Sequence, residues 1–129
     1  MTTITYKVTV ATGTTQYGTG NRFYINGELA PVLYLQEGNT YIFDQSDSSN
    51  NGHPLRFSTT AGGTHGGRTE YTTGVDTTVS GQVKISPTSA TPDSLHYYCH
   101  IHHTLSLNSN FFYYQLLWVL YILNIHKNP

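Results

Sequence analysis

The sequence predicts an all-β protein, a Greek-key β-sandwich followed by an atypical apolar C-terminal tail. Two observations favour this fold class. Charged residues make up only 10% of the 129 residues, and Thr, Ser, Asn, Gly and Tyr take their place, as is typical of exposed strands and turns. In addition, about seven short segments alternate apolar with polar residues between turn signals. The length suits one hydrophobic core, so we expect a single domain.

The first half of the chain contains four of these segments. Residues 4–10 alternate with period two and predict a half-buried strand, after which the Thr- and Gly-rich residues 11–20 predict a polar loop. A short strand over residues 22–25 leads into Asn26-Gly27, a dipeptide that tolerates positive φ and favours a hairpin turn. Residues 33–43 predict two further strands about a central turn.

The second half continues in the same way. Residues 44–52 are almost wholly Asp, Ser, Asn and Gly and predict a surface loop before a strand over 53–57. A glycine-rich loop over 61–67 follows, and then a strand over 83–85. The last alternating segment, 95–99, places its odd-numbered residues inward and its even-numbered residues outward.

Charge and cysteine content exclude several classes of function. The net charge of −1 provides no basic surface for nucleic acid, and a single cysteine excludes an internal disulfide framework. The first six residues have neither the basic region nor the apolar run of a secretory signal. We therefore expect either a protein that stays inside the cell or a piece of a larger chain.

The only cysteine and two histidines form a candidate metal site. Cys99 ends a predicted strand and lies three residues before His102, so a thiolate and an imidazole are close together. His53 begins another strand, on the inward face that it shares with Leu55 and Phe57. Two imidazoles and one thiolate are the trigonal ligand set of blue copper sites, because thiolate suits Cu(I) and imidazole suits both oxidation states.

Three segments carry a resemblance to a known family. Residues 38–44 (GNTYIFD), residues 52–57 (GHPLRF) and the Tyr-Tyr-Cys-x-x-His run over 97–102 resemble the cupredoxins, in particular the plastocyanin-like domains of bacterial surface and phage-associated proteins. The resemblance covers roughly residues 4–104. It implies a blue copper protein that binds one copper ion, cycles between Cu(I) and Cu(II), and exchanges one electron with a redox partner protein. The implied ligands are His53, Cys99 and His102, and the implied location is extracellular, periplasmic or in a virion.

Two positions depart from the family pattern. Leu105 stands where the closest relatives place a weak axial Met, and leucine cannot coordinate a metal. The loss of this soft donor should favour Cu(I) and raise the reduction potential. Pro54 stands where plastocyanin-like proteins tend to have Asn, and it has no N–H with which to support the site.

The C-terminal tail does not continue the alternation. We place the cupredoxin-like domain at residues 1–105 and the tail at 106–129, in which residues 111–125 are almost continuously apolar. About fifteen such residues fall short of the roughly twenty that span a bilayer. Three interpretations stay open: a membrane-interface anchor, a replacement final strand with an extension, or a change of reading frame near Leu105 that removed the native closing strand and exposed a sheet edge.

The other histidines have simpler interpretations. His65 lies in a glycine-rich loop, and His96 and His100 alternate away from Cys99, so we expect all three to be solvated. His103 competes with His102 as a ligand if the loop turns one residue later.

Two alternatives to the copper hypothesis concern the whole chain. A metal-free structural or adhesive module of a surface or virion assembly would use Cys99 as a small buried apolar residue. An enzyme is not expected, because copper oxidases and nitrite reductases need additional histidines, and the one His-x-His pair, His100 and His102, shares a residue with the predicted blue site. Structural zinc prefers four ligands, and only three are well placed here.

Overall fold

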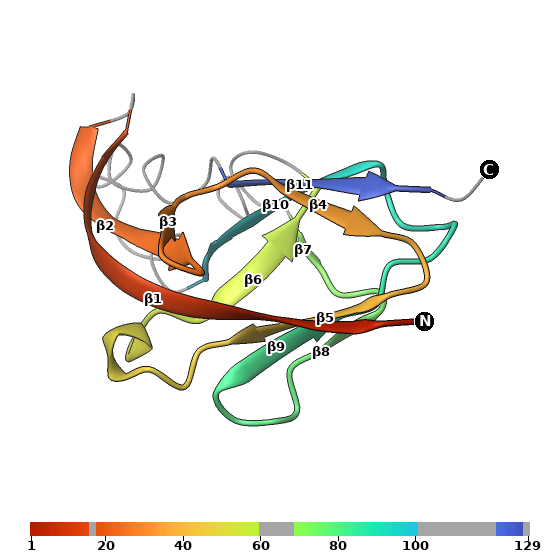
Figure 1. Ribbon diagram of the computed structural model, residues 1–129, viewed down its shortest axis with the longest axis horizontal. Coiled ribbons are helices and arrows are strands. Elements are labelled where there is room, and N and C mark those ends of the chain that lie inside the picture. Colours follow the sequence, from red (N-terminus) through yellow and green to blue (C-terminus); the bar gives the residue numbers. More distant parts are fainter. Residues whose placement is uncertain (16–17, 60–68, 101–120, 128–129) are drawn as a thin grey trace.

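The computed structural model describes residues 1–15, 18–59, 69–100 and 121–127. In these ranges the chain forms eleven β-strands and one 3-10 turn, Ser48–Asn50, and it forms no α-helix. The strands make two sheets around one hydrophobic core (Figure 1). The predicted all-β sandwich is therefore confirmed.

Both sheets are mixed, because β1 runs parallel to β5 and β11 runs parallel to β4, whereas the other neighbours are antiparallel. The six-stranded sheet has the order β3-β2-β1-β5-β9-β8. Its strands are β3 (Glu28–Leu29), β2 (Gly18–Ile25), β1 (Thr3–Thr15), β5 (Thr40–Asp44), β9 (Gln82–Ile85) and β8 (Val75–Asp76). The five-stranded sheet has the order β4-β11-β10-β6-β7. Its strands are β4 (Leu33–Gln36), β11 (Tyr121–His126), β10 (Ser94–Cys99), β6 (Leu55–Ser58) and β7 (Glu70–Tyr71).

The predicted polar loop over residues 11–20 is wrong. The β1–β2 ladder continues through this region as far as the pair Thr15 and Gly18. Threonine is β-branched and suits strands, and pairs of threonines bond across the ladder, as Thr14 and Thr19 do with 2.7 Å between their hydroxyl oxygens. The polar residues here are mostly exposed threonines of a hairpin rather than of a loop.

The predicted turn at Asn26-Gly27 is confirmed. Asn26 has φ of 51° and Gly27 has φ of 84°, and the turn joins β2 to β3. The inward apolar positions predicted from alternation are also buried. They include Tyr41, Phe43, Leu55, Phe57, Val83, Ile85, Leu95, Tyr97 and Cys99.

Part of the apolar tail forms a strand inside the sandwich. β11 lies between β4 and β10 and pairs with both, and its Leu123 and Ile125 are 0% and 6% exposed in the core (Figure 1). No sheet edge is therefore left open between β4 and β10. The predicted domain boundary at residue 105 lies outside the described residues and stays a prediction. Among the described residues, none belongs to a helix long and apolar enough to cross a membrane.

Candidate metal centre

The loop between β5 and β6 delivers His53 to one end of the sandwich. Asp47 caps the 3-10 turn Ser48–Asn50, because its Oδ1 accepts a hydrogen bond from a backbone N–H of the turn at 2.9 Å. Gly52 then takes φ of 79°, a conformation that strains residues with a Cβ. The His53 N–H donates to the Asn50 carbonyl oxygen at 2.8 Å, which fixes the point where the loop meets β6.

Cys99 is the last residue of β10 and is 1% exposed. It pairs with Leu55 of β6, and the next N–H, that of His100, donates to the Pro54 carbonyl oxygen at 2.8 Å. These contacts hold the end of β10 against the residues that follow His53. As a result, Cys99 Sγ lies 3.6 Å from His53 Nδ1.

This separation fits two donors on one metal ion. Typical zinc bonds are about 2.0 Å to a His nitrogen and about 2.3 Å to a Cys sulfur. Two such donors lie about 3.5 Å apart at a tetrahedral angle and about 3.7 Å apart at a trigonal angle. The 3.6 Å between His53 Nδ1 and Cys99 Sγ lies between these values. The pair therefore suits a soft or borderline ion, copper or zinc alike.

The charge state of His53 also suits a metal ligand. Partial burial of the imidazole lowers the pKa of His53 below its ordinary value of 6.5, because desolvation penalises the charged form. The ring is consequently neutral at pH 7. A neutral imidazole is the form that coordinates metals.

The third predicted ligand lies outside the part of the chain that the structure describes. His102, its competitor His103 and the axial position Leu105 all fall within residues 101–120. Among the described residues, no group of three or more His, Cys, Asp or Glu side chains could hold a metal ion. The structure thus brings His53 and Cys99 together, and the assignment of His102 stays a prediction.

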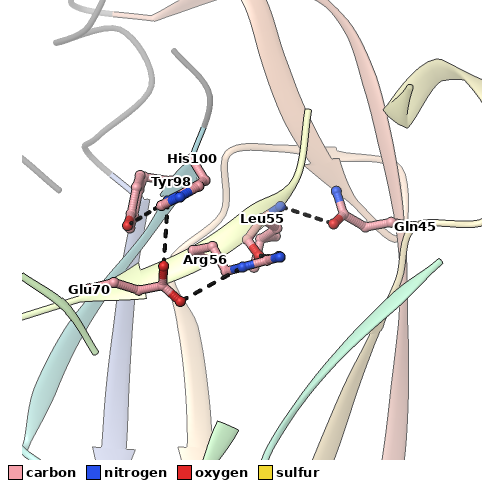
Figure 2. Close-up of polar contacts among 6 residues, drawn as sticks. All are labelled: Gln45, Leu55, Arg56, Glu70, Tyr98 and His100. Carbon is pink, nitrogen blue, oxygen red and sulfur yellow. Dashed lines mark hydrogen bonds and ion pairs between the residues drawn. The ribbon is translucent and has the colours of Figure 1, made fainter. Parts of the chain in front are cut away.

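An ion-pair cluster on the outer face of β6, β7 and β10 was not predicted (Figure 2). Glu70 Oε2 lies 3.7 Å from Arg56 Nε, and Glu70 Oε1 lies 3.5 Å from His100 Nδ1. The Tyr98 hydroxyl lies 3.3 Å from the same His100 nitrogen. The cluster connects edge strand β7 to the residue after Cys99, so it braces the end of β10.

The sequence predicts that three residues of the β10 region, His96, Tyr98 and His100, face outward, and the structure shows how far each is exposed. Tyr98 shares the outward face with Arg56 and His100, as expected, but it is fully buried, at 0% exposure. His100 is 37% exposed and contacts Glu70, so the expected free solvation is only partial. His96 is half-buried, and the expectation of a solvated ring is wrong for it.

Two further histidines complete the comparison. His65 lies outside the described residues, so its expected exposure stays a prediction. His126 ends β11 with an exposed side chain, while its carbonyl oxygen accepts a hydrogen bond from the Glu37 N–H at 2.8 Å.

Comparison with known proteins finds similarity among solved structures alone. No protein-family model and no curated protein matches the sequence. Among solved structures, the chain is similar to a copper nitrite reductase from Nitrosomonas europaea at 14% identity and a TM-score of 0.45, over 100% of this chain and 43% of that one. It is also similar to a blue copper oxidase from Nitrosomonas europaea at 11% identity and a TM-score of 0.48, over 99% of this chain and 40% of that one. The chain spans less than half the length of both neighbours.

The described residues thus form a β-sandwich of two mixed sheets around one core. Its two sheets and the meeting of a loop histidine with a strand-end cysteine agree with the family resemblance of residues 38–44, 52–57 and 97–102.

Proposed function

We propose that the chain is a blue copper domain that binds one copper ion through His53, Cys99 and His102 and transfers one electron. The observation that carries this proposal is the 3.6 Å approach of His53 Nδ1, in the loop before β6, to Cys99 Sγ at the end of β10. A bound copper ion would supply the exchange of one electron between Cu(I) and Cu(II).

The chain's own residues do the rest of the work. Cys99 supplies a thiolate in a nearly water-free position, since its side chain is 1% exposed. His53 supplies a neutral imidazole, and hydrogen bonds hold both the backbone N–H and the backbone carbonyl of this residue. A site held in this way changes little between oxidation states, and that favours electron transfer with a redox partner protein over catalysis on a substrate.

A Cu(II) titration of the full chain tests the proposal. We expect one equivalent of Cu(II) to give an intense visible band from thiolate-to-copper charge transfer, and we expect Cys99→Ser to abolish it because oxygen is a poor substitute for the soft sulfur. His53→Ala should lose most of the affinity, whereas the matched control His126→Ala, on the exposed end of β11, should keep it. Colourless protein without copper in metal analysis would contradict the proposal, and tight colourless zinc binding would replace copper with zinc.

The loop register has its own test. His102→Ala should cost most of the copper affinity and His103→Ala little, because the Cys-x-x-His spacing returns the second imidazole to the thiolate. The opposite result would assign the third ligand to His103.

A metal-free structural or adhesive module is the second candidate. One observation favours it, since Cys99 is a member of the continuous hydrophobic core and therefore also serves as a small apolar residue. In that case Cys99→Ala should not change any binding that the module shows, and copper titration of the wild-type chain should give no visible charge-transfer band.

A further inference from the structure

Gln45 makes an unusual set of contacts just beyond the end of β5. Its Nε2 donates to the His53 carbonyl oxygen at 2.8 Å and to Asn50 Oδ1 at 3.0 Å. Its Oε1 accepts a hydrogen bond from the Leu55 N–H at 2.9 Å, and Figure 2 shows this contact. One amide therefore holds the backbone on both sides of Pro54, and it joins the sheet of β5 to the sheet of β6.

Asn50 extends this support to a third strand. Its side chain is 7% exposed, and its Nδ2 donates to the Val8 carbonyl oxygen of β1 at 2.8 Å. Ser49 Oγ accepts the Val10 N–H at 2.9 Å. The pairing of β5 with β1 ends at Asp44 and Lys7. Beyond that point, the side chains of Ser49 and Asn50 form hydrogen bonds with the β1 backbone in place of a neighbouring strand. The Asn50 carbonyl oxygen also accepts the His53 N–H, as described above.

We propose that Gln45 is the positioning residue of the candidate metal centre, with Asn50 as its own support. Gln45 fixes the His53 carbonyl and Asn50 fixes the His53 N–H, so the residue has little freedom to move its ring away from Cys99. Pro54 has no N–H to donate and is held through its carbonyl oxygen, which accepts the His100 N–H, so Gln45 supplies the hydrogen bonds to the residues on both sides of it. The pair of donors is thereby set at 3.6 Å before any ion binds.

Such support should be measurable in metal affinity. Side chains that orient metal ligands through hydrogen bonds typically change affinity or activity by about 10- to 100-fold when they are replaced. This part of the inference rests on the proposed function. The position of His53 against Cys99 in the metal-free protein does not depend on the proposed function.

Two replacements of Gln45 test the inference. Gln45→Met keeps the size of the side chain and removes all three hydrogen bonds. Gln45→Glu keeps an acceptor for the Leu55 N–H and replaces the donor to the His53 carbonyl with an oxygen. Val83→Ala is the control, since it opens a cavity in β9, where Val83 pairs with Phe43 rather than with Gln45 or Asn50, and lowers stability.

The metal-free readouts are the NMR contact between the His53 ring and the Cys99 β-protons, and hydrogen exchange of the Leu55 amide. Gln45→Met should weaken the contact and speed Leu55 exchange by about tenfold or more relative to the global exchange rate. Gln45→Glu should weaken the contact while it largely preserves Leu55 protection. Val83→Ala should leave the contact intact.

The metal readouts are Cu(II) affinity and the copper hyperfine splitting in electron paramagnetic resonance. Both Gln45 variants should lose about 10- to 100-fold in affinity and change the splitting, whereas Val83→Ala should change neither. An unchanged contact in Gln45→Met would overturn the inference, as would equal effects of Gln45→Met and Val83→Ala. If the wild-type chain binds no copper, the proposed function fails and the metal-free readouts alone decide the role of Gln45.

Discussion

Leu123 provides a sharp test of whether the apolar tail belongs to the folded domain. It is fully buried, and in the ladder it lies opposite Leu33 of β4 on one side and Leu95 of β10 on the other. Leu123→Ala removes three carbon atoms, whose burial is worth about 2.4 kcal/mol at about 0.8 kcal/mol each. Because strands on both sides limit collapse of the cavity, we expect a total loss of about 3–4 kcal/mol in the free energy of unfolding.

Urea unfolding followed by tyrosine and tryptophan fluorescence measures this loss. The matched control is His126→Ala on the same strand, which removes an exposed side chain and should change the free energy of unfolding by less than about 0.5 kcal/mol. Equal, small effects of the two replacements would refute the placement of β11 between β4 and β10.

Three further predictions concern local structure. Gly52→Ala should destabilise the fold by about 1–2 kcal/mol in urea unfolding, because φ of 79° strains a residue with a Cβ, and an unchanged midpoint would contradict that conformation. Hydrogen bonds from Ser49 hold the pKa of the Asp47 carboxyl below its ordinary 3.8, so this carboxylate stabilises the fold above that pH and the contribution is lost as pH falls through the lower folded pKa. The stability difference between wild type and Asp47→Asn should therefore shrink as pH falls from about 5 to about 2, and a constant difference would exclude the cap. Lys127→Met should cost about 1 kcal/mol in thermal or urea unfolding, since the ammonium donates to three carbonyl oxygens of the turn before β10, and no loss would show that these contacts are not formed in solution.

Much of the sandwich could be predicted because burial of one face imposes period two on a strand. Leu55 with Phe57, and Leu95 with Tyr97, show this alternation directly in the sequence, and all four are buried. The same alternation predicted that His53 and Cys99 share an inward face, and the structure brings them together, with Cys99 at the end of β10 and His53 in the loop two residues before β6.

The misses have physical reasons. Most of the threonines between residues 11 and 20 of the β1–β2 hairpin are exposed, so their polarity was mistaken for that of a loop. In β11 the buried Leu123 and Ile125 do alternate with Asn124, but the apolar residues upstream conceal this short pattern. The contact of Glu70 with Arg56 depends on the register of β7 against β6, and a glycine-rich segment separates these two strands in the sequence.

The role of Gln45 was also beyond sequence reasoning. A glutamine in a run of polar loop residues carries no pattern that distinguishes it from its neighbours. Only the three-dimensional path of the loop brings its amide to both sides of Pro54.

X-ray absorption at the copper edge is the most direct test of the central claim that Cys99 and His53 hold a copper ion together. One equivalent of copper is added to the full chain, and the scattering shell is analysed for wild type and for Cys99→Ser. We predict one sulfur and two imidazole nitrogens around copper in the wild-type protein, and no sulfur in the variant. A shell of nitrogen and oxygen alone in the wild-type protein would contradict the account, because copper would then be bound away from Cys99.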